Sequence, residues 1–344
     1  FAHTVAVDPR APSPRAPATM GAVLSACWVG EEDEAAPESF ASASALLGRK
    51  GQRPLGVLSV GVIGTGRSSV INTLLNRADA CHASGGQLRG TRGCSVHRGE
   101  RSAPIEDEPA LELDFVDCEG LRSDQPVRAE ELYKFIELLK PALEQFPGGG
   151  ISHVFVTLDV EERQNHASVH NLLALTELFR EVRERCYLCI TRFNTNSVQA
   201  QWNNELLAWT RANRRAATWD ELSGAPPSPS SMMHSYRAYI DEGFSGAGEA
   251  GAKAKLEQLL RFFDDRVIWM YNLDNMQQED RADGELPPHE EYLYRFYRAA
   301  AIRQLVDGDL GRFPSEKLRI VEHKESLNEL ASACVLQCSD VALI

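Results

Sequence analysis

The residues of this chain that are best suited to chemistry lie in a glycine-rich turn at 61–69, which reads Gly-Val-Ile-Gly-Thr-Gly-Arg-Ser-Ser. An apolar run at 55–60 precedes the turn, and a helical pattern at 69–77 follows it. The backbone N–H groups of such a turn converge on phosphate oxygens, and the positive end of the helix dipole points at the same charge. The segment therefore predicts a phosphate-binding loop, with contacts from Gly61, Gly64, Thr65, Gly66, Arg67, Ser68 and Ser69.

One residue of this loop departs from the usual pattern G-x-x-x-x-G-K-[ST], because Arg67 stands where the lysine is expected. Arginine keeps the positive charge, but its planar guanidinium is bulkier than an ammonium group. We expect it to follow the charge that develops on a transferring phosphoryl group less well than lysine does. The substitution therefore puts catalysis more at risk than binding, while Arg67 remains a candidate catalytic residue.

A second motif, Asp117-Cys118-Glu119-Gly120, follows the apolar run 111–116 about 50 residues further along the chain. Ligands of open α/β sheets bind beyond the carboxyl ends of the strands, which is where this motif would lie. In P-loop GTPases an aspartate at this place holds Mg²⁺ through water, and the glycine N–H meets the γ-phosphate. Since both motifs follow apolar strands in the expected order, together they predict nucleotide binding.

A polar, glycine-rich stretch at 88–95 lies between the two motifs. It is typical of a loop that becomes ordered only around a nucleotide, and Thr91 would then supply a hydroxyl to Mg²⁺ as the second catalytic candidate. Ser95 is the alternative donor. An ordinary solvated turn is the other interpretation of this stretch.

Apolar residues recur along the rest of the chain in alternating strand and helix patterns. Strands are predicted at 55–60, 111–116, 151–158, 187–190 and 267–271, and helices at 69–77, 128–146, 169–180, 203–213, 253–263 and 289–306. Repeated units of this length indicate an α/β fold with three layers, in which helices cover both faces of a mostly parallel central sheet.

The order of these segments resembles the G domain of the avirulence-induced-gene type, which the immunity-associated GTPases share. The loop 61–68 and the segments around Thr91 and Asp117 are also similar to the guanylate-binding and atlastin branch of the dynamin-like GTPases. The resemblance covers about residues 55–275. It implies GTP or GDP and Mg²⁺ as ligands, a nucleotide-dependent homodimer, and frequent membrane association.

The same resemblance assigns roles at the phosphate end of the site. Mg²⁺ would be held by three oxygen-bearing side chains, those of Ser68, Thr91 and Asp117. Asp117 and Gly120 would also sense the γ-phosphate, so that hydrolysis is felt as the loss of a contact.

Recognition of the base would fall to residues that follow two later strands, namely Thr191, Asn194 and Asn272. Asn194 replaces the aspartate whose carboxylate would accept two hydrogen bonds from the guanine edge, and an amide offers one acceptor group there. Selectivity for guanine is therefore open. An ATPase or a kinase with the same loop stays as an alternative, which the motif 117–120 disfavours.

The composition of the 344-residue chain is that of an ordinary soluble globular protein, with a net charge of −13 and a pI near 5.2. Nucleic-acid surfaces need patches of lysine and arginine, so no DNA or RNA partner is expected. No stretch approaches the roughly 18–20 apolar residues that span a bilayer. Eight scattered cysteines are typical of a reducing compartment, which favours the cytoplasm.

Two short patterns resemble metal or redox motifs but lack the second cluster that such sites need. Cys186 and Cys189 form a C-x-x-C inside a strand pattern, and buried strand thiols are the preferred interpretation. His166 and His170 are spaced i, i+4, and we expect a solvated or satisfied pair rather than metal ligands.

The first 54 residues are predicted to form a disordered, acidic tether. If translation starts at Met20, the following sequence fits the M-G-x-x-x-[ST] pattern for myristoylation of Gly21, with Cys27 close behind for palmitoylation. Two lipid chains would hold the protein on the cytosolic face of a membrane, whereas one gives marginal binding. If Met20 is internal, the match has no meaning.

The sequence therefore divides into a tether at 1–54, a G domain at 55–275 with a flexible insertion at 223–252, and a C-terminal helical extension at 276–344. The favoured function is a GTP-dependent switch, a GTPase with slow hydrolysis in which water attacks the γ-phosphate in line. The alternative is a catalytically inactive scaffold that acts through protein contacts.

Overall fold

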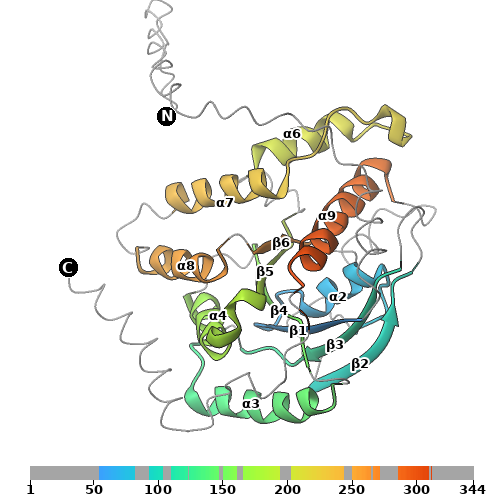
Figure 1. Ribbon diagram of the computed structural model, residues 1–344. Helices are drawn as coiled ribbons and strands as arrows, with labels where there is room; N and C mark the ends of the chain where they lie inside the picture. Colours follow the sequence, from blue (N-terminus) through green and yellow to red (C-terminus); the bar gives the residue numbers. More distant parts are fainter. Residues whose placement is uncertain are drawn as a thin grey trace, which may run out of the picture. The chain divides into compact units, whose positions relative to one another are not determined.

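A six-stranded sheet carries the fold of the described residues, in the order β2-β3-β1-β4-β5-β6 (Figure 1). The computed structural model describes residues 54–81, 93–103, 110–122, 124–146, 150–160, 166–193, 203–243, 250–264, 266–271, 286–309 and 311. The strands are β1 (Leu55–Gly61), β2 (Cys94–Arg101), β3 (Glu112–Cys118), β4 (His153–Asp159), β5 (Cys186–Thr191) and β6 (Val267–Trp269). Neighbouring strands pair in parallel except β2, which is antiparallel to β3.

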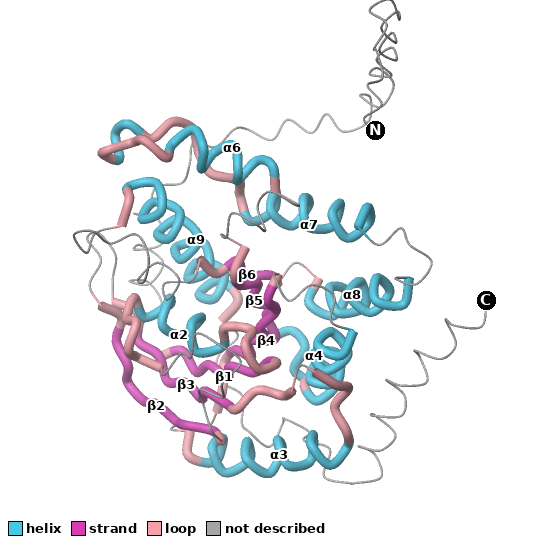
Figure 2. Tube along the Cα trace, turned by 180° about the vertical axis from the view of Figure 1, so that it is seen from behind, coloured by secondary structure: helices cyan, strands magenta, loops and turns pink. Residues whose placement is uncertain are grey.

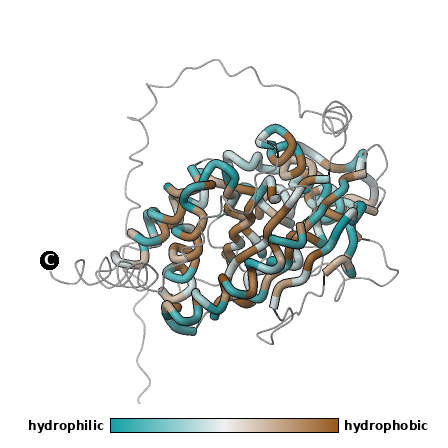
Figure 3. The backbone as a smooth tube through the Cα atoms, turned by 60° about the horizontal axis from the view of Figure 1, so that its bottom comes forward, coloured by the Kyte–Doolittle hydropathy of each residue, from teal (hydrophilic) through white to brown (hydrophobic). Residues whose placement is uncertain are grey.

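The central strands are buried on both faces, because successive residues of a strand point to opposite sides of the sheet. In β1, Val57 belongs to one apolar cluster and Leu58 to the other, and in β5 the same alternation separates Cys189 from Leu188. Figure 3 shows the hydrophobic colour gathered toward the middle of the described chain. This two-sided burial explains why the strands read as nearly continuous apolar runs in the sequence.

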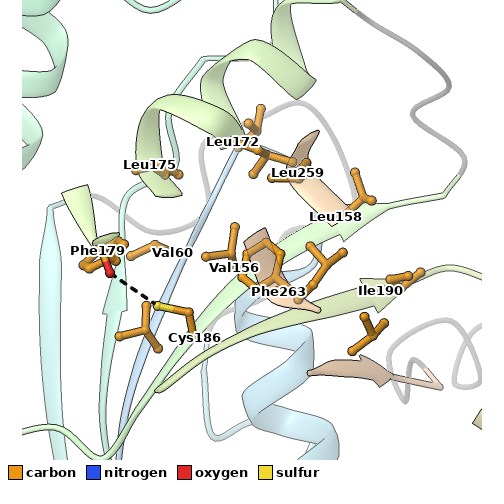
Figure 4. Packing of buried hydrophobic residues seen from close by; sticks show 14 of the residues in the cluster. Val60, Val156, Leu158, Leu172, Leu175, Phe179, Cys186, Ile190, Leu259 and Phe263 are labelled. Atoms are coloured by element: carbon orange, nitrogen blue, oxygen red, sulfur yellow. Dashed lines mark hydrogen bonds between the residues drawn. The ribbon is translucent and has the colours of Figure 1, made fainter. Parts of the chain in front are cut away.

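One face of the sheet is covered by α3 (Ala129–Glu144), α4 (His166–Leu178) and α8 (Ala250–Phe263). Figure 4 shows Leu172 of α4 and Leu259 of α8 above Val156 of β4. The other face is covered by α2 (Arg67–Leu75) and α9 (Pro288–Asp307). Helices therefore lie on both faces of a mostly parallel sheet, which is drawn in magenta in Figure 2, and the predicted fold class is confirmed.

The helix α9 is tied directly to the last turn of α2. The Arg298 guanidinium, which is fully buried, donates to the carbonyl oxygens of Thr73 and Leu74 at 2.9–3.2 Å, and the Tyr294 hydroxyl donates to Thr73 at 3.1 Å. The helix predicted at 289–306 is therefore present, and it packs on the same face of the sheet as α2, although the sequence assigns it to the C-terminal extension 276–344.

The edge strand β2 was not predicted, because its sequence is polar and its residues are half-buried or exposed. It is hydrogen-bonded to β3 as an antiparallel strand, and a side-chain contact adds to this pairing: the His97 ring stacks on its partner Phe115 with centroids 4.5 Å apart. Arg77 of the neighbouring segment pairs with Glu100 at 2.7 Å. A strand that is exposed on one side and rich in charge carries little of the apolar signal on which sequence prediction depends.

The stretch 223–252, predicted as a flexible insertion, contains the helix α7 (Pro229–Gly243). Three apolar residues at i, i+4 and i+8, Met232, Tyr236 and Ile240, are buried in the same core as α4 and α8. Tyr236 meets Trp269 of β6 edge to face, with centroids 6.0 Å apart. The prediction is therefore wrong for 229–243, where a narrow apolar stripe was hidden between proline-, serine- and glycine-rich flanks.

The remaining described elements are α6 (Asn204–Asn213) and two short 3-10 helices, η1 (Arg180–Arg185) and η2 (Trp219–Glu221). Asn203 caps α6 by accepting a hydrogen bond from the Leu206 N–H at 2.9 Å, which confirms the helix expected at 203–213. No helix among the described residues is long and apolar enough to cross a membrane.

Candidate functional site

The glycine-rich loop connects the end of β1 to the first turn of α2, as the sequence predicts. Gly64 and Gly66 have φ values of +89° and +85°, in a region of backbone conformation that residues with a Cβ rarely adopt. A Cβ at Gly61 would lie 2.3 Å from the Thr157 hydroxyl oxygen, which is closer than any real contact. The loop therefore needs its glycines for both backbone conformation and close packing.

Two threonines of neighbouring strands, Thr157 of β4 and Thr191 of β5, hydrogen-bond to the loop and hold its backbone in place. The Thr65 and Thr157 hydroxyl oxygens are 2.6 Å apart, and Thr65 also donates to the Val62 carbonyl at 2.9 Å. Thr191, at the end of β5, is fully buried and donates to the Thr65 carbonyl at 2.8 Å. The structure thus places Thr191, predicted to contact the base, beneath the phosphate loop as a support.

Ser68 and Asp117 meet at the carboxyl end of the sheet, because β1 and β3 are adjacent and parallel. The Ser68 hydroxyl donates to an Asp117 carboxylate oxygen at 2.9 Å, and both residues are buried. A hydroxyl and a carboxylate are the hard oxygen donors that Mg²⁺ takes when phosphates and waters supply its other ligands. These two residues fit a magnesium ion at this edge of the sheet.

The Arg67 side chain folds away from the loop and onto the second motif. Its guanidinium donates to the Cys118 carbonyl oxygen, and a Cβ at Gly120 would lie 2.8 Å from the guanidinium carbon. Burial lowers the pKa of Arg67, an effect that the nearby Asp117 carboxylate opposes. Its Nε has no hydrogen-bond partner among the described residues. The cation therefore lies between the phosphate loop and Gly120.

Backbone hydrogen bonds close the same gap. The Ile63 N–H donates to the Leu121 carbonyl at 2.7 Å, and the Leu121 N–H donates to the Gly61 carbonyl at 3.0 Å. A Cβ at Gly120 would lie 2.7 Å from the Ile63 nitrogen. Gly120 and Leu121 therefore rest directly on the phosphate loop, with Arg67 packed beside them.

The structure brings together the predicted residues of the phosphate end, which are Gly61, Gly64, Thr65, Gly66, Arg67, Ser68, Ser69, Asp117 and Gly120. The predicted residues Thr91, Asn194 and Asn272 lie outside the described residues, as do Gly21 and Cys27. The structure therefore describes the residues predicted to contact Mg²⁺ and the phosphates, apart from Thr91. Contacts of Asn194 and Asn272 with the base remain a prediction.

Sequence reasoning missed the anchor of the segment that follows Gly120. The Asn171 side chain of α4, fully buried, accepts from the Val127 N–H at 2.7 Å and donates to the carbonyls of Arg122 and Gln125 at 2.6 and 3.0 Å. A lone asparagine in a helix gives no sequence signal for such a role. Its three bonds hold Arg122, Gln125 and Val127 against α4.

Replacing Asn171 by alanine should lower the free energy of unfolding by about 2 kcal/mol, because the buried Val127 N–H and the carbonyls of Arg122 and Gln125 lose this partner. It should also speed amide exchange at Val127. Urea denaturation and hydrogen exchange measure the two effects. Asn213→Ala is the matched control, since Asn213 holds Ser223 and Trp209 in the same way elsewhere. Equal exchange at Val127 in both variants would contradict the assigned role.

The described thiols and imidazoles outside this site show no metal cluster. Cys186 and Cys189 belong to the clusters on opposite faces of the sheet, and burial raises the pKa of both thiols. They are buried strand thiols, as expected. No group of three or more His, Cys, Asp or Glu side chains that could hold a metal occurs in the described part of the chain.

The sheet order, with an antiparallel edge strand beside β3, occurs together with a glycine-rich loop between the central strand and a helix. The chain has the three-layer fold of a P-loop NTPase. No protein-family model matches the chain, and no curated protein sequence matches it.

Solved structures with detectable similarity include Toc33 from Arabidopsis thaliana. Its complex with GDP and Mg²⁺ is 15% identical, with a TM-score of 0.44, and the match covers 78% of this chain and 89% of Toc33. Its complex with Mg²⁺ and GMPPNP is 14% identical, with a TM-score of 0.43, and covers 80% and 95% of the two chains.

Proposed function

We propose that this chain is a guanine-nucleotide-binding switch that holds its nucleotide and Mg²⁺ at the loop 61–69, with slow hydrolysis. The observation that carries the proposal is the hydrogen bond between the Ser68 hydroxyl and the Asp117 carboxylate at the mouth of this loop, 2.9 Å long. It joins the two predicted motifs at the sheet edge where ligands of open α/β folds bind.

The chain's own groups would divide the work as follows. The backbone N–H groups of the loop and the first turn of α2 would bind phosphate oxygens. Ser68 and Asp117 would hold Mg²⁺, which supplies the charge that neutralises the phosphates. If a water attacks the γ-phosphate, the Gly120 N–H would face the γ-phosphoryl group that is transferred to the water, and the diphosphate would be the leaving group. The two threonines beneath the loop, Thr157 and Thr191, would keep its backbone in place.

The structure around Gly120 hinders the binding of a nucleoside triphosphate more than that of a diphosphate. The place between the loop and Gly120 is taken by the Arg67 guanidinium and by the bonds that join Ile63 to Leu121. A triphosphate has to displace both before Gly120 can face it, whereas the loop N–H groups that bind the inner phosphates do not depend on Arg67. We therefore expect the diphosphate to bind more tightly.

Calorimetric titration with GDP and ADP, with and without Mg²⁺, tests the proposal. GDP should bind at micromolar concentration and ADP about tenfold more weakly. Ser68→Ala should remove the Mg²⁺ dependence, because it removes a hydroxyl ligand. Ser152→Ala is the matched control, because the buried Ser152 hydroxyl bonds the backbone of Gly56 at 3.0 Å, at the other end of β1. Equal binding of ADP and GDP would refute guanine selectivity, and loss of Mg²⁺ dependence in the Ser152 variant would refute the metal assignment.

A catalytically inactive scaffold is the second candidate, and the position of Arg67 favours it. A site in which Arg67 and Leu121 never leave the loop would bind no triphosphate and would act through protein contacts alone. No binding and no hydrolysis of GTP by a chain that unfolds cooperatively, whether or not GDP binds, is the result that selects this candidate.

The proposal includes attachment to the cytosolic face of a membrane through acylated Gly21 and Cys27, on the strength of the sequence pattern at Met20. It also includes a nucleotide-dependent homodimer, which the family resemblance implies.

A further inference from the structure

Two cysteines face each other beside the candidate site, at the point where β2 begins and β3 ends. Cys94 and Cys118 are direct partners in the antiparallel pairing of these strands, and their sulfur atoms are 3.1 Å apart. Cys118 lies inside the motif 117–120, next to Asp117. We propose that Cys94 and Cys118 are a redox site that closes to a reversible disulfide under hydrogen peroxide.

The backbone geometry at this pair suits a disulfide. The Glu119 N–H donates to the Gly93 carbonyl at 2.5 Å. This backbone hydrogen bond joins the residues that flank Cys94 and Cys118, so the two cysteines form a non-hydrogen-bonded pair of the antiparallel ladder. Such non-hydrogen-bonded pairs bring Cα atoms to about 4.5 Å, inside the range of about 4.4–6.8 Å that disulfides span. The sulfur atoms need to approach by only about 1 Å to reach the bond length of about 2.05 Å.

The two thiols differ in a way that separates their roles. Cys94 is half-buried at the sheet edge, whereas Cys118 is fully buried. Cys94 is therefore the thiol that peroxide reaches from solvent, and Cys118, whose sulfur lies 3.1 Å behind it, is the thiol that resolves the product.

The chemical step balances with one molecule of hydrogen peroxide. The Cys94 thiolate attacks one peroxide oxygen, the O–O bond breaks, and the hydroxide that leaves takes up a proton to become water, which leaves Cys94 as a sulfenic acid. The Cys118 sulfur then attacks the Cys94 sulfur, and the sulfenic oxygen leaves as a second water with the Cys118 proton. Two thiols are oxidised by two electrons in total, and a dithiol reductant reverses the reaction.

The other described cysteines do not form such a pair. Cys186 and Cys189 point to opposite faces of the sheet, so their sulfur atoms are separated by the strand itself. Cys81 is buried in the cluster beneath α2 and α9. Among the described thiols, the facing arrangement therefore belongs to Cys94 and Cys118.

A disulfide here would reach the candidate nucleotide site through Arg67. The Arg67 guanidinium donates to the carbonyl of Cys118, and the bridge would tie this residue to the start of β2. Opening the gap at Gly120 for a third phosphate requires movement of the segment 118–121, which the bridge restrains. This consequence rests on the proposed function, whereas disulfide formation does not.

Peptide mapping of the full chain after peroxide treatment tests the redox site. The thiols that remain are alkylated before digestion under non-reducing conditions. The expected product is a linked pair of peptides that contains Cys94 and Cys118, lighter than the two free peptides by two hydrogens and separated by dithiothreitol. Recovery of Cys94 and Cys118 as alkylated thiols, or Cys94 bonded to another cysteine or oxidised to the sulfinic acid, would overturn the proposal.

The variants Cys94→Ser and Cys81→Ser separate this pair from general oxidation. Cys118 should stay alkylatable after peroxide in the Cys94→Ser chain, while the bridge should still form in the Cys81→Ser chain. A bridge to Cys118 in the Cys94→Ser chain would count against the assigned partner. Oxidised wild-type protein should also bind a GTP analogue about fivefold more weakly than reduced protein. If the reduced protein binds no nucleotide, the proposed function fails while the mapped disulfide stands.

Discussion

Replacing Arg67 by lysine should raise the affinity of the chain for a GTP analogue about tenfold or more, which corresponds to ~1.4 kcal/mol or more. Lysine keeps one positive charge but carries it on a slim, flexible chain. The guanidinium now lies against Gly120 and bonds the Cys118 carbonyl, so its removal frees the place that a third phosphate needs. GDP affinity should change much less, because the inner phosphates meet the loop backbone.

Titration of the variant with GDP and with a non-hydrolysable GTP analogue measures the effect. Arg77→Lys is the matched control: Arg77 follows the same helix and pairs with Glu100 at 2.7 Å away from the loop. An equal rise in affinity for both nucleotides, or the same rise in affinity in the Arg77 variant, would show that Arg67 does not block the place of the third phosphate. Turnover of GTP should rise with affinity if the site hydrolyses, and unchanged turnover despite tighter binding would count against a hydrolytic site.

Replacing Arg298 by alanine should lower the free energy of unfolding by about 3 kcal/mol, since hydrogen bonds from a buried charged group are among the strongest. The Arg298 guanidinium bonds the last carbonyls of α2 at Thr73 and Leu74, which would be left buried and without this donor. Because α2 begins at the phosphate loop, α9 stabilises the helix that carries the candidate site.

Urea denaturation followed by tryptophan fluorescence measures this loss. Arg295→Ala on the same helix is the matched control, because Arg295 makes an i, i+4 ion pair with Glu291 and lies over the Trp219 ring at 4.7 Å, both partly exposed. We expect it to lose about 1 kcal/mol or less. Equal losses in the two variants would mean that the contact between α9 and α2 contributes little to stability.

The sequence predicts most of the sheet because its strands are buried on both faces. Residues such as Val57 and Leu58 are both apolar although they point in opposite directions, and this makes the runs conspicuous. The strand β2 and the helix α7 escaped prediction for the opposite reason. Each buries only a narrow set of side chains within a polar segment, as Met232, Tyr236 and Ile240 do in α7.

Only part of the candidate site can be predicted from the sequence. The loop 61–69 and the motif 117–120 are recognisable because both follow apolar strands at a set spacing. The supports of the loop, Thr157 and Thr191, act across strands that are far apart in sequence, so no local pattern reports their contacts. The sequence shows that Arg67 replaces lysine, but only the fold shows that its side chain turns onto Cys118 and Gly120.

The most direct measurement is a calorimetric titration of the full reduced chain with GDP and with a non-hydrolysable GTP analogue, each with Mg²⁺ at one salt concentration. If Arg67 occupies the place of the third phosphate, we expect GDP to bind at micromolar concentration and the analogue to bind more weakly than GDP by about tenfold or more. Equal or tighter binding of the analogue, or no binding of either nucleotide, would contradict this expectation.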